Sequence, residues 1–279
     1  MKAVVFVPSA PGSDWVREAL PWLSPVQLPL AGRRWIDYAV EWAAARGYQM
    51  AEVVDWQWSE TVAADYADLT AHPIPVFYQR GEGPLPKTPD DVRRLSSPLS
   101  QDAGRNGVDL VWGLGLEDFP LAGVRDWHRT NMALLEGSGP GGLSYTLPGY
   151  SAEHGIRLGR NVVTEPGFSA KPPVLLCDNV WCARNVRLEG GCIVDRGAFV
   201  DEGARLERTL VCRGTYLGPG LELTDKILIG NRLFDAVTGA WTDIEERGVA
   251  RRLGERWHCP RWLAAIARFF AGRAPGRAS

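Results

Sequence analysis

Residues 174–215 read VLLCDNVWCARNVRLEGGCIVDRGAFVDEGARLERTLVCRGT, and this stretch decides the fold of the second half of the chain. Cut at every sixth residue, it places an aliphatic or small side chain at the first and third positions of each hexad. A period of six fits neither an α-helix nor one long strand. It predicts short strands that are separated by turns and wound into a solenoid.

Two sets of side chains are predicted to point into this solenoid, and each hexad contributes to both. The first set is Leu176, Cys182, Leu188, Val194, Val200, Leu206 and Cys212. The second set, four positions further on, is Val180, Val186, Cys192, Ala198, Ala204, Leu210 and Tyr216. Cysteines at inward positions are predicted to be small buried hydrophobic residues.

The hexad register extends upstream through Leu158, Val162 and Phe168 and fades downstream of Tyr216. Residues 156 to about 233 resemble the left-handed parallel β-helix of hexapeptide-repeat proteins, in which three hexads make one triangular coil. The left hand is implied by this resemblance and not by the spacing. Acyltransferases of this type need a histidine base at a coil corner. No histidine lies inside the repeat, and only His154, just before it, keeps a hexapeptide acyltransferase as a minor alternative.

Residues 1–137 are predicted to form an α/β domain, because strand and helix patterns alternate. MKAVVF (1–6) and AEVVDW (51–56) read as strands. A short helix is expected after Ser13 or Asp14, and a longer one through Ile36 and Ala43 that ends at Gly47. The Pro-, Gly- and Ser-rich residues 79–107 are expected to form a long loop.

Four segments, in order, resemble the sugar-phosphate nucleotidyltransferases, the pyrophosphorylases that make nucleotide sugars. They are MKAVVF (1–6), QLPLAGRRWIDYAVEWAAARG (27–47), AGVRDWHRTNMALLEG (122–137) and the following hexapeptide repeat. The resemblance implies a shortened Rossmann-like nucleotide-binding domain. In the family's closing stretch, a strand that carries a tryptophan leads into a helix.

The phosphate-handling residues of that family are largely missing. Its first loop has closely spaced glycines and an arginine, so that N–H groups and a positive charge surround a triphosphate. Here VPSAPGSDW (7–15) keeps only Gly12, and Asp14 or Trp15 stands where the arginine is expected. Pro25 takes the place of a phosphate-binding lysine, and Gly113-Leu114 takes the place of a metal-binding Gly-Asp pair.

The retained scaffold with lost phosphate chemistry predicts a divergent, non-catalytic subunit of nucleotide-sugar or polysaccharide metabolism, with a regulatory or assembly role. Its expected ligand is a nucleotide or sugar phosphate, and it is expected to form homo-oligomers or to bind a partner enzyme. The candidate ligand-binding residues are Gly12, Ser13, Arg33 and Arg34.

An active sugar-1-phosphate nucleotidyltransferase is the main alternative. In it, Arg33 and Arg34 hold the phosphates, and Asp37, Glu117 or Asp118 holds Mg²⁺.

After a 138–155 linker with a GSGPGG hinge (137–142) and the solenoid (156–246), the chain ends in an arginine-rich tail (247–279). Within the tail, 257–272 is predicted to form an amphipathic helix with Trp262, Leu263, Ile266, Phe269 and Phe270 on one face. We expect this helix to cap the open end of the solenoid. Peripheral contact with an anionic membrane is the alternative.

Composition limits the remaining classes. A net charge of −2 predicts no general attraction to nucleic acid. The five cysteines contain no CxxC pair, which favours reduced thiols and a cytoplasmic protein.

Overall fold

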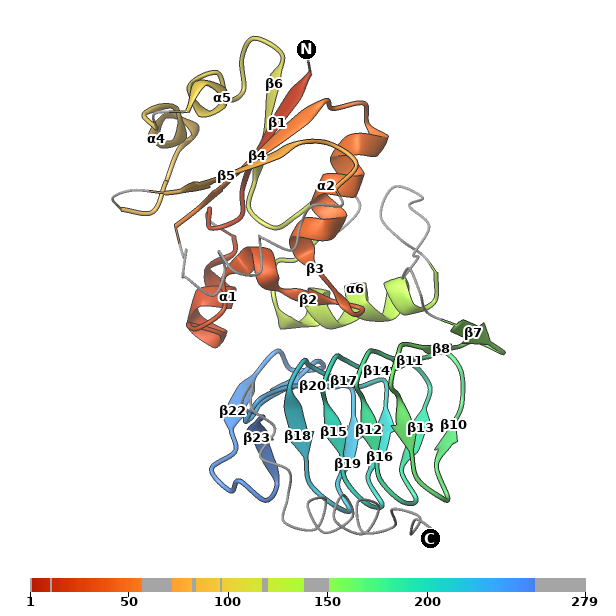
Figure 1. Ribbon diagram of the computed structural model, residues 1–279. Coiled ribbons are helices and arrows are strands. Elements are labelled where there is room, and N and C mark those ends of the chain that lie inside the picture. Colours follow the sequence, from red (N-terminus) through yellow and green to blue (C-terminus); the bar gives the residue numbers. More distant parts are fainter. Residues whose placement is uncertain are drawn as a thin grey trace, which may run out of the picture.

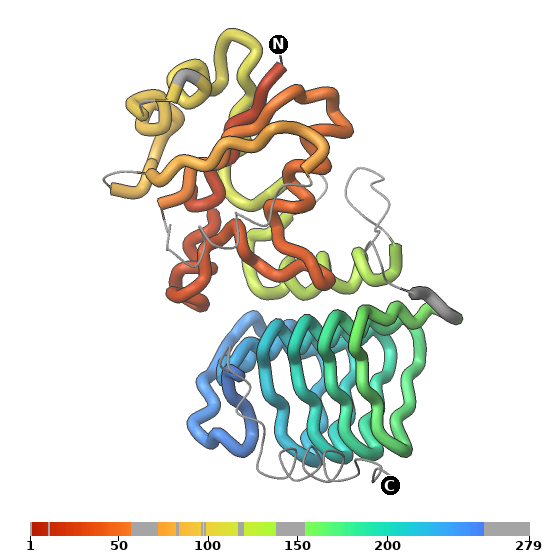
Figure 2. Tube along the Cα trace, viewed as in Figure 1, coloured from red at the N-terminus to blue at the C-terminus, as the bar shows by residue number. Residues whose placement is uncertain are grey.

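The computed structural model describes residues 2–10, 12–56, 72–81, 84–95, 97–116, 120–137 and 151–253. An α/β region lies on one flat side of a β-solenoid, and the helix α6 (Val124–Leu135) lies between them (Figure 1). The chain trace in Figure 2 shows the stacked coils of the solenoid. The predicted order, an α/β region followed by a β-solenoid, is confirmed. The 138–150 part of the expected linker and the expected helix at 257–272 lie outside the described residues.

A parallel four-stranded sheet in the order β5-β4-β1-β6 forms the centre of the α/β region. Every residue of β1 is buried, because helices cover both faces of the sheet. Val4 and Phe6 pack on the side of α2, whereas Ala3, Val5 and Val7 pack on the opposite side. The strands are β1 (Ala3–Val7), β4 (Met50–Asp55), β5 (Val76–Arg80) and β6 (Val108–Trp112).

The helices and short elements before β4 largely follow the sequence pattern. Ser13 is the N-cap of α1, although its hydroxyl group bonds back to the carbonyl oxygen of Ala10 at 2.7 Å. Gly47 follows α2 with φ of 77°, a left-handed conformation that glycine adopts without strain. The elements are α1 (Asp14–Ala19), η1 (Pro25–Gln27), β2 (Pro29–Leu30), β3 (Arg33–Arg34) and α2 (Trp35–Ala45).

Two expectations about the rest of the α/β region are wrong. The expected loop at 79–107 contains two short helices, α4 (Pro89–Arg93) and α5 (Pro98–Gln101). They are ordered against the sheet because Val92 and Ala103 are buried on the face of Val5. Trp127, which the family resemblance placed on a strand, lies within α6.

Three stacks of short parallel strands form the solenoid. The first stack faces the α/β region and contains β8 (Ile156–Leu158), β11 (Val174–Leu176), β14 (Cys192–Val194), β17 (Leu210–Val211) and β20 (Lys226–Ile229). The second contains β9 (Val163–Thr164), β12 (Trp181–Cys182), β15 (Phe199–Val200) and β18 (Thr215–Leu217). The third contains β10 (Ser169–Ala170), β13 (Arg187–Glu189), β16 (Arg205–Glu207) and β19 (Glu222–Thr224).

Antiparallel strands close both ends of the coil stack. At the first coil, β7 (Ser151–Glu153) pairs with β8. At the last, β21 (Arg232–Asp235) and β22 (Trp241–Asp243) continue from β20, and β23 (Ala250–Arg252) pairs with β18.

The hexad register shifts by one residue at the corner after β16. Phe199 pairs with Trp181, eighteen residues before it, but with Tyr216 only seventeen residues after it. The corner that holds Gly190 and Gly191 in one coil holds Arg208 alone in the next, with φ of 46°.

Three of the inward predictions are therefore wrong. Tyr216 faces outward, and Leu210 faces the α/β region. Cys212 lies at the corner after β17, next to Val211, which pairs with the inward Val194. Cys177, Cys182, Cys192 and Cys212 are buried and free, which confirms the prediction of buried thiols for this part of the chain.

A shared hydrophobic core joins the α/β region to the solenoid. The outward residues of the first stack are buried against the α/β region; they are Leu175, Ile193, Leu210 and Ile227. A row of aromatic rings also crosses the junction, with centroid distances of 5.8, 5.6 and 6.2 Å; it consists of Trp15, Trp127, Phe234 and Trp241.

The helix α6 runs along the stacking direction, across the edges of successive coils (Figure 1). Met132 packs at Gly191, where an added Cβ would lie 3.3 Å from the methionine sulfur. One helical turn earlier, His128 contacts Arg208, one coil further on. A helical turn rises about 5.4 Å and neighbouring strands lie about 4.8 Å apart, so each turn meets one coil.

Candidate functional site

The carboxyl ends of the parallel strands are the expected ligand site of an open α/β sheet. At this edge, Asp55 ends β4 and is fully buried. Its Oδ1 accepts a hydrogen bond from the Ser9 hydroxyl at 3.0 Å, and its Oδ2 accepts one from the Ser24 hydroxyl. Both serines are themselves buried, with 3% exposure. The carboxylate therefore ties the loop after β1 to the segment that precedes η1.

The loop after β1 is folded on itself. The N–H of Ala10 and the N–H of Gly113 both bond to the carbonyl oxygen of Val7, at 3.2 and 3.0 Å. The N–H and the hydroxyl group of Ser13 both bond to the carbonyl oxygen of Ala10. Gly12 is exposed with φ of 100°. The N–H groups of Ala10 and Ser13 are thus used inside the loop and are not available to a phosphate.

The two candidate arginines have carboxylate partners next to them. Arg33 makes a bidentate contact with Glu41 at 3.0 and 2.6 Å, and its guanidinium lies 4.7 Å from the ring centroid of Tyr38. Arg34 precedes α2 and contacts Asp37 through its backbone N–H and its guanidinium, both at 2.9 Å. These pairs hold β3 against the first turns of α2 and neutralise the positive charge.

Of the residues considered for Mg²⁺, the structure describes only Asp37. Asp37 is occupied as the capping-box carboxylate of α2. Leu114, which the sequence resemblance aligned with a metal-binding aspartate, is buried, and its carbonyl oxygen accepts the Trp35 indole N–H at 2.8 Å. Glu117 and Asp118 lie outside the described residues. Among the residues that the structure describes, no group of three or more His, Cys, Asp or Glu side chains could hold a metal ion.

The described histidines lie at separate places. His154 is exposed in the turn between β7 and β8, with φ of 48°. His72 lies 3.4 Å from the hydroxyl group of Tyr78. His128 is buried at the junction, and its Nε2 lies 2.6 Å from the carbonyl oxygen of Arg208. Burial lowers the pKa of His128, although the bond to this carbonyl acts in the opposite direction.

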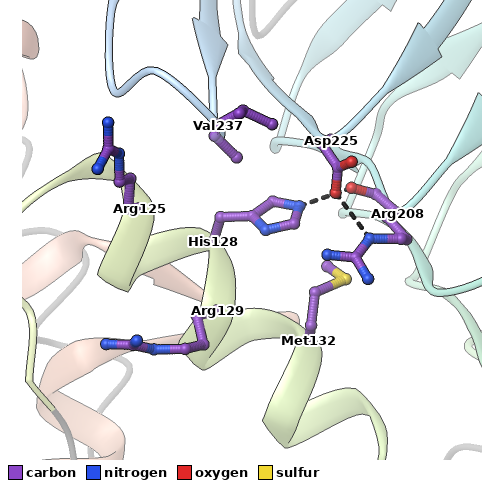
Figure 3. Close-up of a pocket in the computed structure, with 8 residues that line it drawn as sticks. Arg125, His128, Arg129, Met132, Arg208, Asp225 and Val237 are labelled. Carbon is purple, nitrogen blue, oxygen red and sulfur yellow. Dashed lines mark hydrogen bonds and ion pairs between the residues drawn. The ribbon is translucent and has the colours of Figure 1, made fainter.

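A pocket of about 320 Å³ lies between α6 and the solenoid (Figure 3). Its charged side chains already have partners: Arg208 pairs with Asp225 at 2.7 Å, and Arg125 donates to the carbonyl oxygen of Thr238 at 3.1 Å. Arg129 pairs with Asp126 and points away from His128 in Figure 3. Each charged side chain of this part of the junction thus already has a partner, although the partner of Arg125 is a neutral carbonyl group.

No protein-family model and no curated protein sequence matches this chain. In the described part of the chain, no helix has the length and apolar character that a bilayer span requires.

The sequence pattern did not predict the buried cluster of Ser9, Ser24 and Asp55 at the carboxyl ends of the parallel strands. A lone aspartate after an apolar strand was the only available signal, because Ser24 lies 31 residues away in the chain. The Ser24 contact depends on how the α1–η1 segment folds back over the sheet edge.

Proposed function

We propose that this chain is a non-catalytic relative of the sugar-phosphate nucleotidyltransferases, which acts as a regulatory or assembly subunit in nucleotide-sugar or polysaccharide metabolism. The observation that supports this proposal is the closed loop after β1. The N–H groups of Ala10 and Ser13 bond to the carbonyl oxygens of Val7 and Ala10, and the hydroxyl group of Ser9 bonds to the buried carboxylate of Asp55.

A nucleotidyltransferase must neutralise a triphosphate while a phosphoryl group is transferred, which requires cations or a metal ion and free donors. At this sheet edge the carboxylate of Asp55 is buried, and its negative charge repels an anion. Arg33 and Arg34 are paired with Glu41 and Asp37. Both features favour a structural role for these residues over catalysis.

The deciding experiment uses the full chain with a panel of nucleoside triphosphates, sugar 1-phosphates and Mg²⁺. We expect no pyrophosphate release above background. Release that is lost in Arg33→Gln would overturn the proposal in favour of the active-transferase alternative. Release that is equal in the wild type and in this variant points to a contaminating enzyme.

Thermal unfolding with the same compounds tests the binding part of the proposal. A ligand that binds only the folded chain raises its unfolding temperature. Stabilisation without turnover supports a ligand-sensing subunit, and no stabilisation by any compound supports an assembly role. Light scattering across a range of protein concentrations measures whether the chain associates with itself.

A further inference from the structure

The three faces of the solenoid present different outward side chains. On the first stack they are aliphatic and buried against the α/β region. On the third stack they are charged and exposed, as in the pair Arg205–Glu222 at 3.1 Å. On the second stack they are apolar and mostly aromatic, and we call this surface the aromatic face; its members are Val163, Trp181, Phe199 and Tyr216.

Rings in successive coils of the aromatic face stack on one another. The centroids of Trp181 and Phe199 lie 6.1 Å apart at 15°, and those of Phe199 and Tyr216 lie 5.6 Å apart at 29°. Val163, at one end of the row, is 39% exposed. Carboxylates bond to the polar atoms of the outer rings: Glu165 accepts from Trp181 Nε1 at 3.2 Å, and Asp201 accepts from the Tyr216 hydroxyl at 2.6 Å. Phe199, in the middle of the row, is only 5% exposed, whereas Trp181 and Tyr216 are half-buried. The apolar surface that remains for a contact therefore lies at Val163 and along these two outer rings, beside their polar partners.

The described chain ends beside this face. Strand β23 pairs with β18, which places the Arg251 guanidinium 4.3 Å from the ring centroid of Tyr216. The N–H of Leu253, the last described residue, bonds to the carbonyl oxygen of Gly214. Residues 254–279 therefore start at the edge of the aromatic face.

We propose that residues 257–272 dock on the aromatic face of the solenoid as an amphipathic helix. Its apolar side chains, which helical spacing places together, contact the stacked rings; they are Trp262, Leu263, Ile266, Phe269 and Phe270. Sixteen helical residues extend about 24 Å. Four stacked strands extend about 15 Å, so one helix of this length covers the whole row. This location on the side of the prism differs from the end cap that the sequence alone suggested.

Docking has a consequence for the other partners that this tail could have. A helix that buries its aromatic side chains against Trp181 and Tyr216 cannot insert them into a lipid surface at the same time. It also covers the face that a second copy of the chain could otherwise use. The inference does not depend on the proposed function, because it concerns only the solenoid and the tail.

Limited proteolysis of the full chain with trypsin tests the proposal, because the tail has arginines at 256, 261 and 268. We expect cleavage after Arg261 and Arg268 to be at least tenfold faster in Trp181→Ala than in the wild type. The matched control is Arg205→Ala on the charged face, and we expect it to leave the rates unchanged. Equal rates in all three proteins would overturn the proposal.

A reciprocal variant keeps the test valid if Trp181→Ala unfolds the solenoid. The double variant Phe269→Ser with Phe270→Ser changes only the tail. We expect it to show the same acceleration of tryptic cleavage, with an unchanged circular dichroism spectrum. Protection of the wild type that grows with protein concentration would instead identify a second copy as the partner. Protection that appears only with phosphatidylglycerol vesicles would identify the membrane. Either result would overturn docking within one chain.

Discussion

The imidazole Nε2 of His128 lies 2.6 Å from the carbonyl oxygen of Arg208, so a side chain of α6 is bonded to the backbone of a solenoid corner. Arg208 has φ of 46° in that corner and also pairs with Asp225 of the next coil. One coil earlier, Met132 packs at Gly191. These contacts attach the α/β region to particular coils, in addition to the apolar core that the two regions share.

The stability of the protein is expected to decrease below about pH 6.5, the usual pKa of histidine. Burial lowers the pKa of His128 in the folded state, so the unfolded chain takes up a proton first as the pH falls. This loss levels off below the folded-state pKa. Urea denaturation between pH 7.5 and 5.5 measures the slope of the unfolding free energy against pH. We expect His128→Gln to reduce it, because glutamine can donate to the same carbonyl but does not titrate. His72, whose pKa burial also lowers, remains in both proteins.

Removing the donor altogether gives a separate prediction. His128→Ala leaves the buried carbonyl of Arg208 without this partner and is expected to cost about 1–3 kcal/mol of unfolding free energy at pH 7.5. The exposed His154→Ala is the control, with an expected change within about 0.5 kcal/mol. Equal costs for the two variants would contradict the importance of the junction bond.

Gly191 and Gly197 form a matched pair for testing the contact with α6. Both have positive φ, 96° and 66°, but only at Gly191 would a Cβ meet Met132. Each Gly→Ala change is expected to cost about 1–2 kcal/mol from backbone strain. We expect Gly191→Ala to cost more, and the excess to shrink in the background of Met132→Ala. A double-mutant cycle by chemical denaturation measures this coupling, and a zero coupling energy would contradict the contact.

Asp195 is expected to reduce the stability of the protein at neutral pH. Burial raises its pKa, although the N–H of Arg196 bonds to Oδ1 at 2.6 Å. As the pH rises above the unfolded value of about 4, the unfolded chain loses the proton first and stability decreases. Asp195→Asn is therefore expected to raise the unfolding temperature at pH 7 relative to the wild type and to lose this advantage near pH 4. Calorimetry at the two pH values checks this, with the exposed Glu202→Gln as control.

Asp55 is expected to make a large contribution to the stability of the protein. Asp55→Ala leaves the buried hydroxyl groups of Ser9 and Ser24 without their acceptor and is expected to cost about 2–5 kcal/mol. Asp90→Ala, at a 70% exposed side chain, is the control with little expected change. Urea denaturation separates the two. A stable Asp55→Ala protein would show that the sheet edge does not depend on this carboxylate.

The solenoid could be predicted from sequence because each coil repeats the same inward positions, as at Leu188 and Leu206. The one-residue shift could not, because Arg208 occupies a left-handed corner where glycine is the usual signal. The buried Asp55 and the coil-by-coil contacts of α6 depend on residues far apart in the chain. Local patterns do not contain that information. Pro8 and Gly12 alone predict a loop with few donors for a phosphate, whereas the bonds that Ala10 and Ser13 make within it required the structure.

The match between α6 and the coils also limits how proteins of this design can change in length. Because a helical turn rises about 0.6 Å more than a coil, the two periods drift apart by about half a coil after four steps. A straight helix can therefore follow only a short solenoid. Inserting one coil between Gly191 and Arg208 would require about one extra turn between Met132 and His128, so an insertion in either segment is expected to survive only with a compensating insertion in the other.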